Sequence, residues 1–417
     1  MKITVSSPDL RPSLVGPLQG LAAAGALDRV ITTLAFARDG KALALAGRWS
    51  RRSASLLRRR VVPDGLEALV ECIPLGEVLL QASGRLRLGD RAHHRVWMWA
   101  EPYFDRKVAE RLAGRAGVHY GHEHATLASF ETQKRAGGRC ILRQVNAHYQ
   151  FLDAVLDEEH HRFGSPDSAG WRAVLETRAR VNARKAAEYA LADLIVANSA
   201  FVRRTFIQAG LPEERVVVAP TGCPAPPPAG AEPATRPRIV LCAGHVSLRK
   251  GTLYLIEAWR RLGLPPAEAE LVLAGRTMLP PALLANLPAG VRLAGAVGAA
   301  DLNRLYREAS LFVLPTLCEG LAHVIPEALA NGLPIVTTPH SGGEDLIANG
   351  VNGWIVPIRD ADALADRIMW ALEHPSELAG MRDAAFRTAA SRTRAAAVAS
   401  HVAVVLGSAN RSTPVHA

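Results

Sequence analysis

The sequence predicts an α/β protein of two domains, each built on a parallel β-sheet. Short, continuously apolar runs such as LFVL at residues 311–314 recur along the chain and are typical of strands buried on both faces. Helical segments alternate with these runs, as they do in the strand–helix–strand units of parallel sheets. The chain of 417 residues is long enough for two domains of roughly 150 to 200 residues each.

The composition favours a water-soluble protein with large buried cores. Hydrophobic residues make up 49% of the chain, and the mean hydropathy is +0.07. No apolar segment of a secretory signal follows Lys2, and no apolar run approaches the roughly 18 residues of a membrane span. The five cysteines are scattered and lack CxxC spacing, so we expect buried free thiols in a reducing compartment. These features predict a cytoplasmic protein.

The formal net charge of +10 raises the question of an anionic partner. Arginine is spread along the whole chain, aromatic residues make up only 5%, and no nucleic-acid-binding motif is present, so we expect no nucleic acid partner. One stretch, GRWSRRSASLLRRR, concentrates positive charge between Arg48 and Arg60. On a helix it could make a peripheral contact with acidic lipid at the inner membrane face or hold a lipid diphosphate. A solvated helix or loop is the alternative that we favour.

In the first half of the chain, the predicted strands end in polar loops. The run VHYGHEHAT holds His119, His122 and His124 in such a loop, without the HExxH spacing of a zinc site, so we expect no metal. A later strand at residues 140–148 ends at His148. The other expected elements are a strand at 2–6, a loop at 8–16, helices at 17–24, 151–163, 172–192 and 198–210, strands at 194–197 and 215–219, and a proline-rich linker at 224–237.

The second half is organised around the segment 311–357. A strand at 311–314 is followed by a helix that begins near Ala322 and ends at Gly332, and then by a strand at 333–338. Another helix is expected to begin at Glu344, and Asp360 fits an N-cap better than part of a metal-binding DxD. The remaining expected elements are strands at 239–242, 271–274 and 291–293, helices at 361–370 and between 376 and 406, and a frayed tail at 407–417.

Two acidic residues eight positions apart stand out in this segment. Glu319 is expected in the loop ahead of the central helix and Glu327 within the helix, so both can reach one crevice. Ligands of parallel sheets bind at the carboxyl ends of strands, and the free N–H groups at a helix start favour an anion there. The segment therefore predicts a crevice that both acids and the N-terminus of the helix face.

The block EGLAHVIPEALANGLP, followed by GGED and NGWIVP, resembles the retaining glycosyltransferases of the glycogen-synthase-like family 4. Members of this family have the GT-B fold, in which two Rossmann-like domains with parallel sheets face each other across a cleft. The resemblance implies an acceptor-binding domain at residues 1–218 and a nucleotide-sugar-binding domain at 219–385. It also implies that a C-terminal helix within 386–417 crosses back to the first domain.

The same resemblance implies roles for charged residues. The loop GHVSLRKG resembles the family's Gly-Arg-x-x-x-x-Lys-Gly, whose two cations hold the donor diphosphate. Lys250 matches, whereas His245 stands where arginine is expected. A largely neutral imidazole binds a diphosphate less well than a guanidinium does, so either Arg249 compensates or His245 is protonated when the phosphate arrives. Glu327 would bind the ribose hydroxyls and Glu319 the sugar.

Further residues are placed around the ligands by the resemblance alone. His148 would orient the donor sugar, and Val297 lies in the loop 295–298, which would run beside the nucleotide base. The N–H groups at the helix start would lie near the phosphates, and a loop after the first strand, together with the histidine-rich loop, would lie on the acceptor side. The residues near the phosphates would be Gly320, Leu321, Ala322 and His323. Those on the acceptor side would be Gly16, His122 and His124.

The sequence thus predicts a metal-independent retaining glycosyltransferase of hexosyltransferase type (EC 2.4), with no cofactor and with Glu319, His148 and Lys250 as catalytic residues. It would move a sugar from a nucleotide diphosphate sugar to a hydroxyl of a glycan, lipid-linked or small-molecule acceptor, with the donor phosphate as base, in polysaccharide or glycoconjugate biosynthesis. The alternative is a non-catalytic GT-B nucleotide-binding or scaffold subunit. His245, Ala322 and the absence of the family's Gly-Gly pair near Gly16 favour that alternative.

Overall fold

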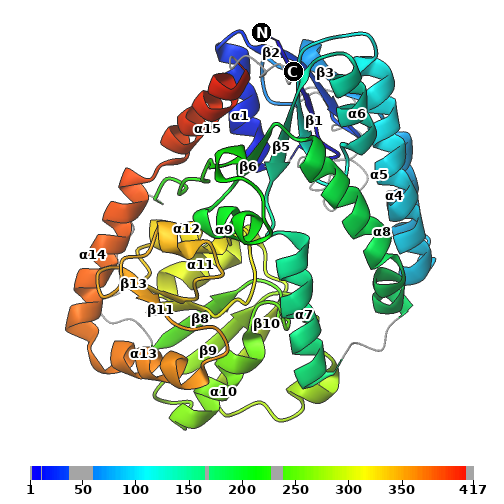
Figure 1. Cartoon of the computed structure of the whole chain (residues 1–417). Helices are drawn as coiled ribbons and strands as arrows, with labels where there is room; N and C mark the ends of the chain where they lie inside the picture. The colour runs from blue at the N-terminus through cyan, green and yellow to red at the C-terminus, as the bar shows by residue number, and fades with distance from the viewer. Residues whose placement is uncertain (1, 11, 37–59, 165–168, 227–237, 410–417) are drawn as a thin grey trace, which may run out of the picture.

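The computed structural model describes residues 2–10, 12–36, 60–164, 169–226 and 238–409, and its two parallel sheets confirm the predicted fold class. In these residues the N-terminal sheet has the order β3-β2-β1-β4-β5-β6-β7, and the C-terminal sheet has the order β10-β9-β8-β11-β12-β13. Every pair of neighbouring strands is parallel. Figure 1 shows the N-terminal domain above the C-terminal one, with helices covering the sheets.

The strands form because apolar, often β-branched runs are buried on both faces. In β11, for example, all four residues from Leu311 to Leu314 are buried. The N-terminal strands are β1 Ile3–Ser6, β2 Leu27–Thr32, β3 Val70–Cys72, β4 Val118–His122, β5 Arg139–Gln144, β6 Leu194–Ala197 and β7 Val216–Val218. The C-terminal strands are β8 Ile239–Ala243, β9 Glu270–Ala274, β10 Val291–Gly295, β11 Leu311–Leu314, β12 Ile335–Thr337 and β13 Gly353–Ile355.

The helices pack their apolar sides against the sheets. Those of the N-terminal half are α1 Pro12–Ala23, α4 Leu75–Arg85, α5 Asp90–Leu112, α6 Leu127–Arg135, α7 Tyr149–Phe163, α8 Ala169–Leu191 and α9 Ala200–Gln208. Those of the C-terminal half are α10 Thr252–Leu262, α11 Ala299–Glu308, α12 Val324–Ala330, α13 Ala361–Glu373, α14 Pro375–Ser391 and α15 Arg394–Ala409. The side chain of Asp360 accepts a hydrogen bond from Ala363 N at 2.8 Å, which confirms the predicted N-cap of α13.

The last helix, α15, lies against α1 of the N-terminal domain (Figure 1). A Cβ at Gly16 would lie 2.5 Å from a methyl group of Val398, so the two helices approach closely there. His401 Nε2 lies 2.7 Å from the hydroxyl of Tyr120 at the centre of the N-terminal sheet. The boundary predicted at residue 385 falls inside the continuous helix α14, and the chain crosses back only after Ser391.

Several predicted element boundaries are wrong. Helix α1 begins at Pro12, so residues 12–16 form its first turns and not a loop. Strand β5 ends at Gln144, four residues before His148. The helix expected at Glu344 is a single 3₁₀ turn, Gly343–Asp345, and α12 begins at Val324 and not near Ala322. Cys72 is exposed, whereas the other four cysteines are buried free thiols, as predicted.

Some predictions concern residues that the structure does not describe. The basic stretch between Arg48 and Arg60 lies outside the described residues except for Arg60 itself, as do most of the linker and residues 410–417 of the tail. Within the described part of the chain, no helix is both long and apolar enough to cross a membrane.

Candidate active site

The loop after β8 carries the cations of the site. Its tight path depends on glycine: Gly251 has a φ of 65°, and a Cβ there would lie 1.9 Å from the carbonyl oxygen of Pro315 in the loop after β11. This close approach brings Arg249 and Lys250 to the neighbouring loop. Lys250 is only 8% exposed, which is uncommon for lysine and calls for an anionic partner.

That partner is Glu319, in the loop after β11. Its Oε1 lies 3.0 Å from Lys250 Nζ and 3.0 Å from Arg249 Nη2. The backbone of Glu319 is fixed by its N–H, which donates to the carbonyl oxygen of His340 at 2.8 Å in the loop after β12. Three loops at the carboxyl ends of adjacent strands thus hold one carboxylate between two cations.

Glu327 lies in α12, the helix that follows this loop, and has a different environment. Its Oε2 accepts a hydrogen bond from the hydroxyl of Tyr306 on α11 at 3.1 Å. Burial raises the pKa of the Glu327 carboxyl above its ordinary value, against the opposing effects of the Tyr306 hydrogen bond and of Arg394. The two acids that the sequence placed in one crevice therefore differ: Glu319 is paired with cations, whereas Glu327 accepts from a neutral hydroxyl.

The other residues expected around the donor are placed as follows. His245 and His323 are exposed, Val297 is half-buried, and Leu321 and Ala322 are buried in the C-terminal core. Arg249, not His245, reaches Glu319. Ala322 lies in the loop between Glu319 and the start of α12 at Val324. Its side chain is packed in the C-terminal core.

Gly320 is where the two domains meet. A Cβ at Gly320 would lie 1.8 Å from the carbonyl oxygen of Val145, which follows β5 in the N-terminal domain. The hydroxyl of Ser199, at the start of α9, donates to the carbonyl oxygen of Gly320, and the Asn198 side chain donates to Val145 O at 3.2 Å. The loop that carries Glu319 is therefore clamped against the loops after β5 and β6.

His148 follows Val145 on the N-terminal side of this contact. It is the N-cap of α7, where its Nδ1 accepts from Gln150 N at 3.4 Å, and it is not the last residue of a strand as predicted. Its ring packs against the rings of Tyr149, Tyr189 and Phe206 at 4.5 to 5.2 Å. Burial lowers the pKa of His148 to about 4, so the imidazole is neutral near pH 7.

A cavity of about 360 Å³ opens in the N-terminal domain beside this loop. His122, at the end of β4, and His124 line it, and the His124 ring stacks on Trp97 with centroids 4.8 Å apart. His124 has a φ of 71°, and buried Glu188 holds this strained turn by accepting from the His124 N–H at 2.6 Å. Other lining residues are Asp9, Thr33, Arg60, Glu77, Glu101, Glu123, Asn146 and Lys185.

Gly16 does not belong to this cavity. It lies in α1 and faces Val398 of α15, so its small size serves helix packing. The expectation that Gly16 borders the acceptor rested on a loop at residues 8–16, and the structure has helix from Pro12 onward.

Sequence reasoning missed the buried network around Glu123. This carboxylate accepts from the Tyr189 hydroxyl, from Gln144 Nε2 at 2.9 Å, and pairs with Lys185 at 3.3 Å. Burial raises the pKa of Glu123, but Lys185 and the hydrogen bonds more than offset this, and the net pKa is lowered. Because its members come from the loop after β4, from β5 and from α8, no local spacing could reveal the network; the only signal was the acid between two histidines.

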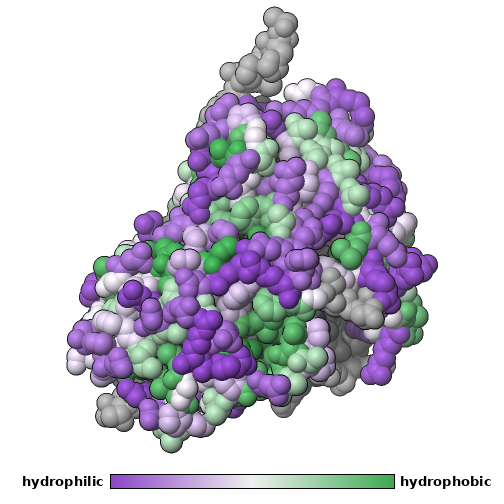
Figure 2. All heavy atoms as spheres, turned by 60° about the horizontal axis from the view of Figure 1, so that its bottom comes forward, coloured by the Kyte–Doolittle hydropathy of each residue, from purple (hydrophilic) through white to green (hydrophobic). Residues whose placement is uncertain are grey.

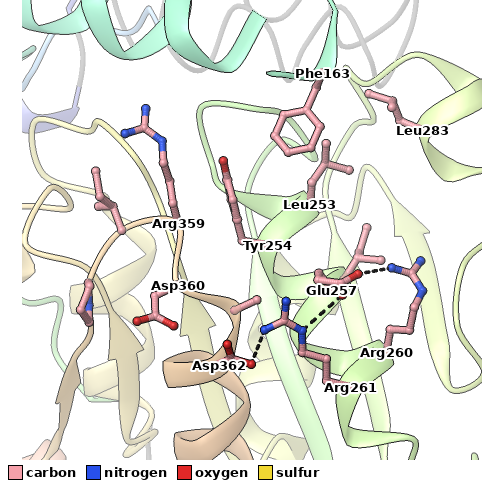
Figure 3. Close-up of a pocket in the computed structure, with 14 residues that line it drawn as sticks. Phe163, Leu253, Tyr254, Glu257, Arg260, Arg261, Leu283, Arg359, Asp360 and Asp362 are labelled. Atoms are coloured by element: carbon pink, nitrogen blue, oxygen red, sulfur yellow. Dashed lines mark hydrogen bonds and ion pairs between the residues drawn. The ribbon is translucent and has the colours of Figure 1, made fainter. Parts of the chain in front are cut away.

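No group of His, Cys, Asp or Glu in the described residues could hold a metal ion. A second cavity, of about 770 Å³, lies beside α10 (Figure 3). Its lining residues do not include Glu319, Lys250, Arg249 or Glu327. On that end of the molecule, Figure 2 shows green hydrophobic side chains gathered beside purple hydrophilic ones.

Comparison with known proteins relates the chain to glycosyltransferases. Residues 237–374 match the family described as Glycosyl transferases group 1. The amylovoran biosynthesis glycosyltransferase AmsK of Erwinia amylovora is 33% identical over 141 residues, so this chain spans only 35% of that relative's length and the match covers 31% of this chain. The D-inositol 3-phosphate glycosyltransferase of Thermobispora bispora is 26% identical over 374 residues, covering 75% of this chain and 87% of that protein.

A solved structure extends the likeness over both domains. Anabaena Alr3699/HepE in complex with UDP-glucose superposes with a TM-score of 0.62 at 18% identity, covering 98% of this chain and 100% of that one. This likeness concerns the fold, which has two domains built on parallel sheets.

Proposed function

We propose that this chain, which has the GT-B fold and whose residues 237–374 match the family described as Glycosyl transferases group 1, moves a sugar from a nucleotide diphosphate sugar to an acceptor hydroxyl with retention of configuration. The observation that carries the proposal is the cluster in which one carboxylate oxygen of Glu319 lies 3.0 Å from both Lys250 and Arg249, in the loop that leads into α12 and its Glu327. The loop that carries Glu319 lies directly against the loop after β5 of the N-terminal domain. A Cβ at Gly320 would lie 1.8 Å from the carbonyl oxygen of Val145.

The cations suit the leaving group of such a donor. Cleavage of the bond between the anomeric carbon and the phosphate oxygen leaves negative charge on the diphosphate, and preorganised positive charge at that point lowers the barrier. Lys250 is held in place by burial and Arg249 by contacts with Glu319 and the carbonyl oxygen of Cys318. No metal is required for this neutralisation.

The two carboxylates would bind different parts of the donor. Glu327, when ionised, accepts hydrogen bonds from a pair of ribose hydroxyls, and its partner Tyr306 fixes its orientation. Glu319 would bind sugar hydroxyls and face the positive charge that develops on the sugar. Neutral His148, at the start of α7, can donate its Nε2 proton to a sugar hydroxyl without adding a charge, because its Nδ1 already accepts from Gln150 N.

The reaction balances without a protein nucleophile. The acceptor oxygen forms a bond to the anomeric carbon on the face from which the phosphate departs, and the bond to the phosphate oxygen breaks. The acceptor proton passes to that departing oxygen. The N-terminal cavity beside His122 and His124 would hold the acceptor, because it lies next to the loop that meets Gly320.

We also propose that the chain works in the cytoplasm, since its five cysteines are free thiols, as a reducing compartment requires. An acceptor in polysaccharide or glycoconjugate synthesis fits the printed names of relatives such as AmsK, and peripheral contact with a membrane through the stretch ending at Arg60 stays part of the proposal.

A nucleotide panel tests the proposed function. Melting temperatures would be measured with UDP, GDP, ADP, dTDP and their sugars, because a ligand that binds the folded state raises the melting temperature by mass action. We expect one base to stabilise the protein, the shift to vanish in Glu327→Ala, and the matching nucleotide sugar to be hydrolysed slowly. Stabilisation without turnover of any sugar would favour a non-catalytic nucleotide-binding subunit, and no shift with any nucleotide would contradict the transferase and favour a scaffold subunit.

A further inference from the structure

Helix α7 belongs to the N-terminal domain by sequence but lies along the C-terminal domain (Figure 1). It begins directly after His148 and ends at Phe163. Near its start, the Phe151 ring meets the His340 ring edge-on, with centroids 5.0 Å apart, and His340 also accepts the hydrogen bond from Glu319 N. Near its end, the Phe163 ring packs edge-on against Tyr254 at 5.8 Å.

Between these contacts, Glu159 projects from α7 into the C-terminal domain. Its carboxylate is fully buried and accepts from the Tyr254 hydroxyl at 3.1 Å and from Arg359 Nε at 2.7 Å. Arg359 also pairs with Glu158 at 2.9 Å. Figure 3 shows the side chains of Tyr254 and Arg359 extending from the C-terminal domain in the same direction, beside Phe163.

Two features indicate that the fold specifically maintains this cluster of Glu159, Tyr254 and Arg359. A buried carboxylate is costly unless it is fully paired, and here both partners come from the opposite domain. In addition, Arg359 has a φ of 63°, a left-handed conformation that costs roughly 1 kcal/mol for a residue with a side chain and is kept only where the surroundings enforce it. A cavity of about 770 Å³ borders Tyr254 and Arg359.

We propose that Glu159 is a positioning residue that sets the distance between the two halves of the active site. Tyr254 stands in the first turn of α10, four residues after Lys250, while Glu159 stands three turns after His148 on α7. Through the pair of Glu159 and Tyr254, a displacement of α7 moves His148 relative to Lys250. This inference rests on the proposed function, because it assigns the two halves to one reaction.

The test compares Glu159→Ala and Glu159→Gln with wild type in donor hydrolysis, nucleotide affinity and small-angle X-ray scattering. The residues that we assign to the nucleotide lie in the C-terminal domain, away from Glu159. We therefore expect the nucleotide affinity of both variants to stay within about twofold of wild type. Loss of the contact misplaces His148, so kcat should fall about 10- to 100-fold in Glu159→Ala. Glu159→Gln keeps an acceptor for the Tyr254 hydroxyl and should recover part of the rate.

Glu176→Ala is the matched control, because Glu176 is an exposed acid paired with Arg91 within the N-terminal domain. It should leave kcat and the scattering curve unchanged. Tyr254→Phe should lower kcat less than Glu159→Ala does. The fold-decrease of kcat in the double variant should be smaller than the product of the two single fold-decreases, as expected for residues that share one contact.

Donor turnover tests the proposed function, and small-angle scattering tests the positioning role of Glu159, so the failure of one can be told from the failure of the other. If wild type turns over no donor, the proposed function fails, while scattering still tests the positioning role through the radius of gyration, which we expect to increase in Glu159→Ala. An unchanged radius, or a lower melting temperature with unchanged kcat, would overturn the inference and leave Glu159 as a purely structural residue.

Discussion

The carboxylate of Glu319 lies 3.0 Å from the ammonium of Lys250, on the same oxygen that Arg249 contacts. In the absence of donor, the acid therefore occupies the cations that we assign to the diphosphate. Binding of the donor must replace one anion by another at the same two charges. This exchange keeps a buried lysine paired in both states and avoids the cost of an isolated buried charge.

The exchange predicts an unusual result for Glu319→Gln. Without the competing carboxylate, a nucleoside diphosphate that lacks the sugar should bind about 3- to 10-fold more tightly, since about 1 kcal/mol of ion pairing no longer opposes it. Turnover of the nucleotide sugar should fall at least about 100-fold. Isothermal titration and a coupled nucleotide-release assay measure the two effects; weaker nucleotide binding in the variant would refute the competition.

Lys250→Met should remove the charge that meets the leaving group. We expect kcat to fall about 100- to 1000-fold, with a smaller loss in Arg249→Met because Arg249 is more exposed. Lys107→Met, which removes an exposed lysine paired with Glu110, is the control. Equal rates in Lys250→Met and Lys107→Met would exclude the assigned role.

Nucleotide binding should depend on pH through Glu327. Only the ionised carboxylate accepts two hydroxyl hydrogen bonds, and burial raises its pKa, so affinity should already decline as the pH falls toward values where an ordinary glutamate is still ionised. Glu327→Gln should weaken binding about 10-fold at pH 7 and remove this part of the dependence. Comparing the two proteins between pH 5 and pH 8 cancels protonation of the nucleotide itself, and identical slopes would contradict the assignment.

Closure of the site should be sensitive to Gly320. Gly320→Val would push the Glu319 loop away from Val145, because even a Cβ would lie 1.8 Å from that carbonyl oxygen. We expect turnover to be lost while nucleotide binding by the C-terminal domain persists. Gly84→Ala in α4, where a Cβ meets nothing within 4 Å, should leave activity unchanged and slightly stabilise the helix. Full activity in Gly320→Val would show that the contact is dispensable.

Acid should destabilise the protein through two buried histidines. Burial lowers the pKa of His119 and of His401 to about 4, below the value of 6.5 of the unfolded chain. The unfolded state therefore binds more protons between these values, and stability should be lost as the pH falls from 6.5 to 4, by up to about 1.4 kcal/mol per pH unit for each histidine. His401→Gln should flatten the decline of melting temperature in this window, whereas His161→Gln, at an exposed position, should not.

The sequence predicted the parallel sheets and the central segment because both depend on local patterns. Apolar runs mark β8 and β11, and the eight-residue interval between Glu319 and Glu327 survives in the structure as a loop acid and a helix acid. Boundaries that depend on tertiary contacts were predicted wrongly. A helix start at Pro17 is the local expectation, but α1 begins at Pro12, and its Gly16 packs against α15 from the far end of the chain.

The partners of buried acids could not be predicted for a similar reason. Glu159 stands in the polar run DEEHH, where no local pattern distinguishes it from its neighbours, yet it is fully buried because Tyr254 and Arg359 approach from the other domain. Glu123 drew attention only as the neighbour of two histidines. Its partners come from other strands and helices, so only the folded structure brings them together.

The measurement that tests the account most directly is time-resolved ¹H NMR of the nucleotide sugar that stabilises the protein, incubated with wild type and with Glu319→Gln. We predict that wild type releases or transfers the sugar with the anomeric configuration of the donor in the first-formed product, and that Glu319→Gln does so at least about 100-fold more slowly. A first product of inverted configuration, or equal rates in the two proteins, would contradict the proposed mechanism at this site.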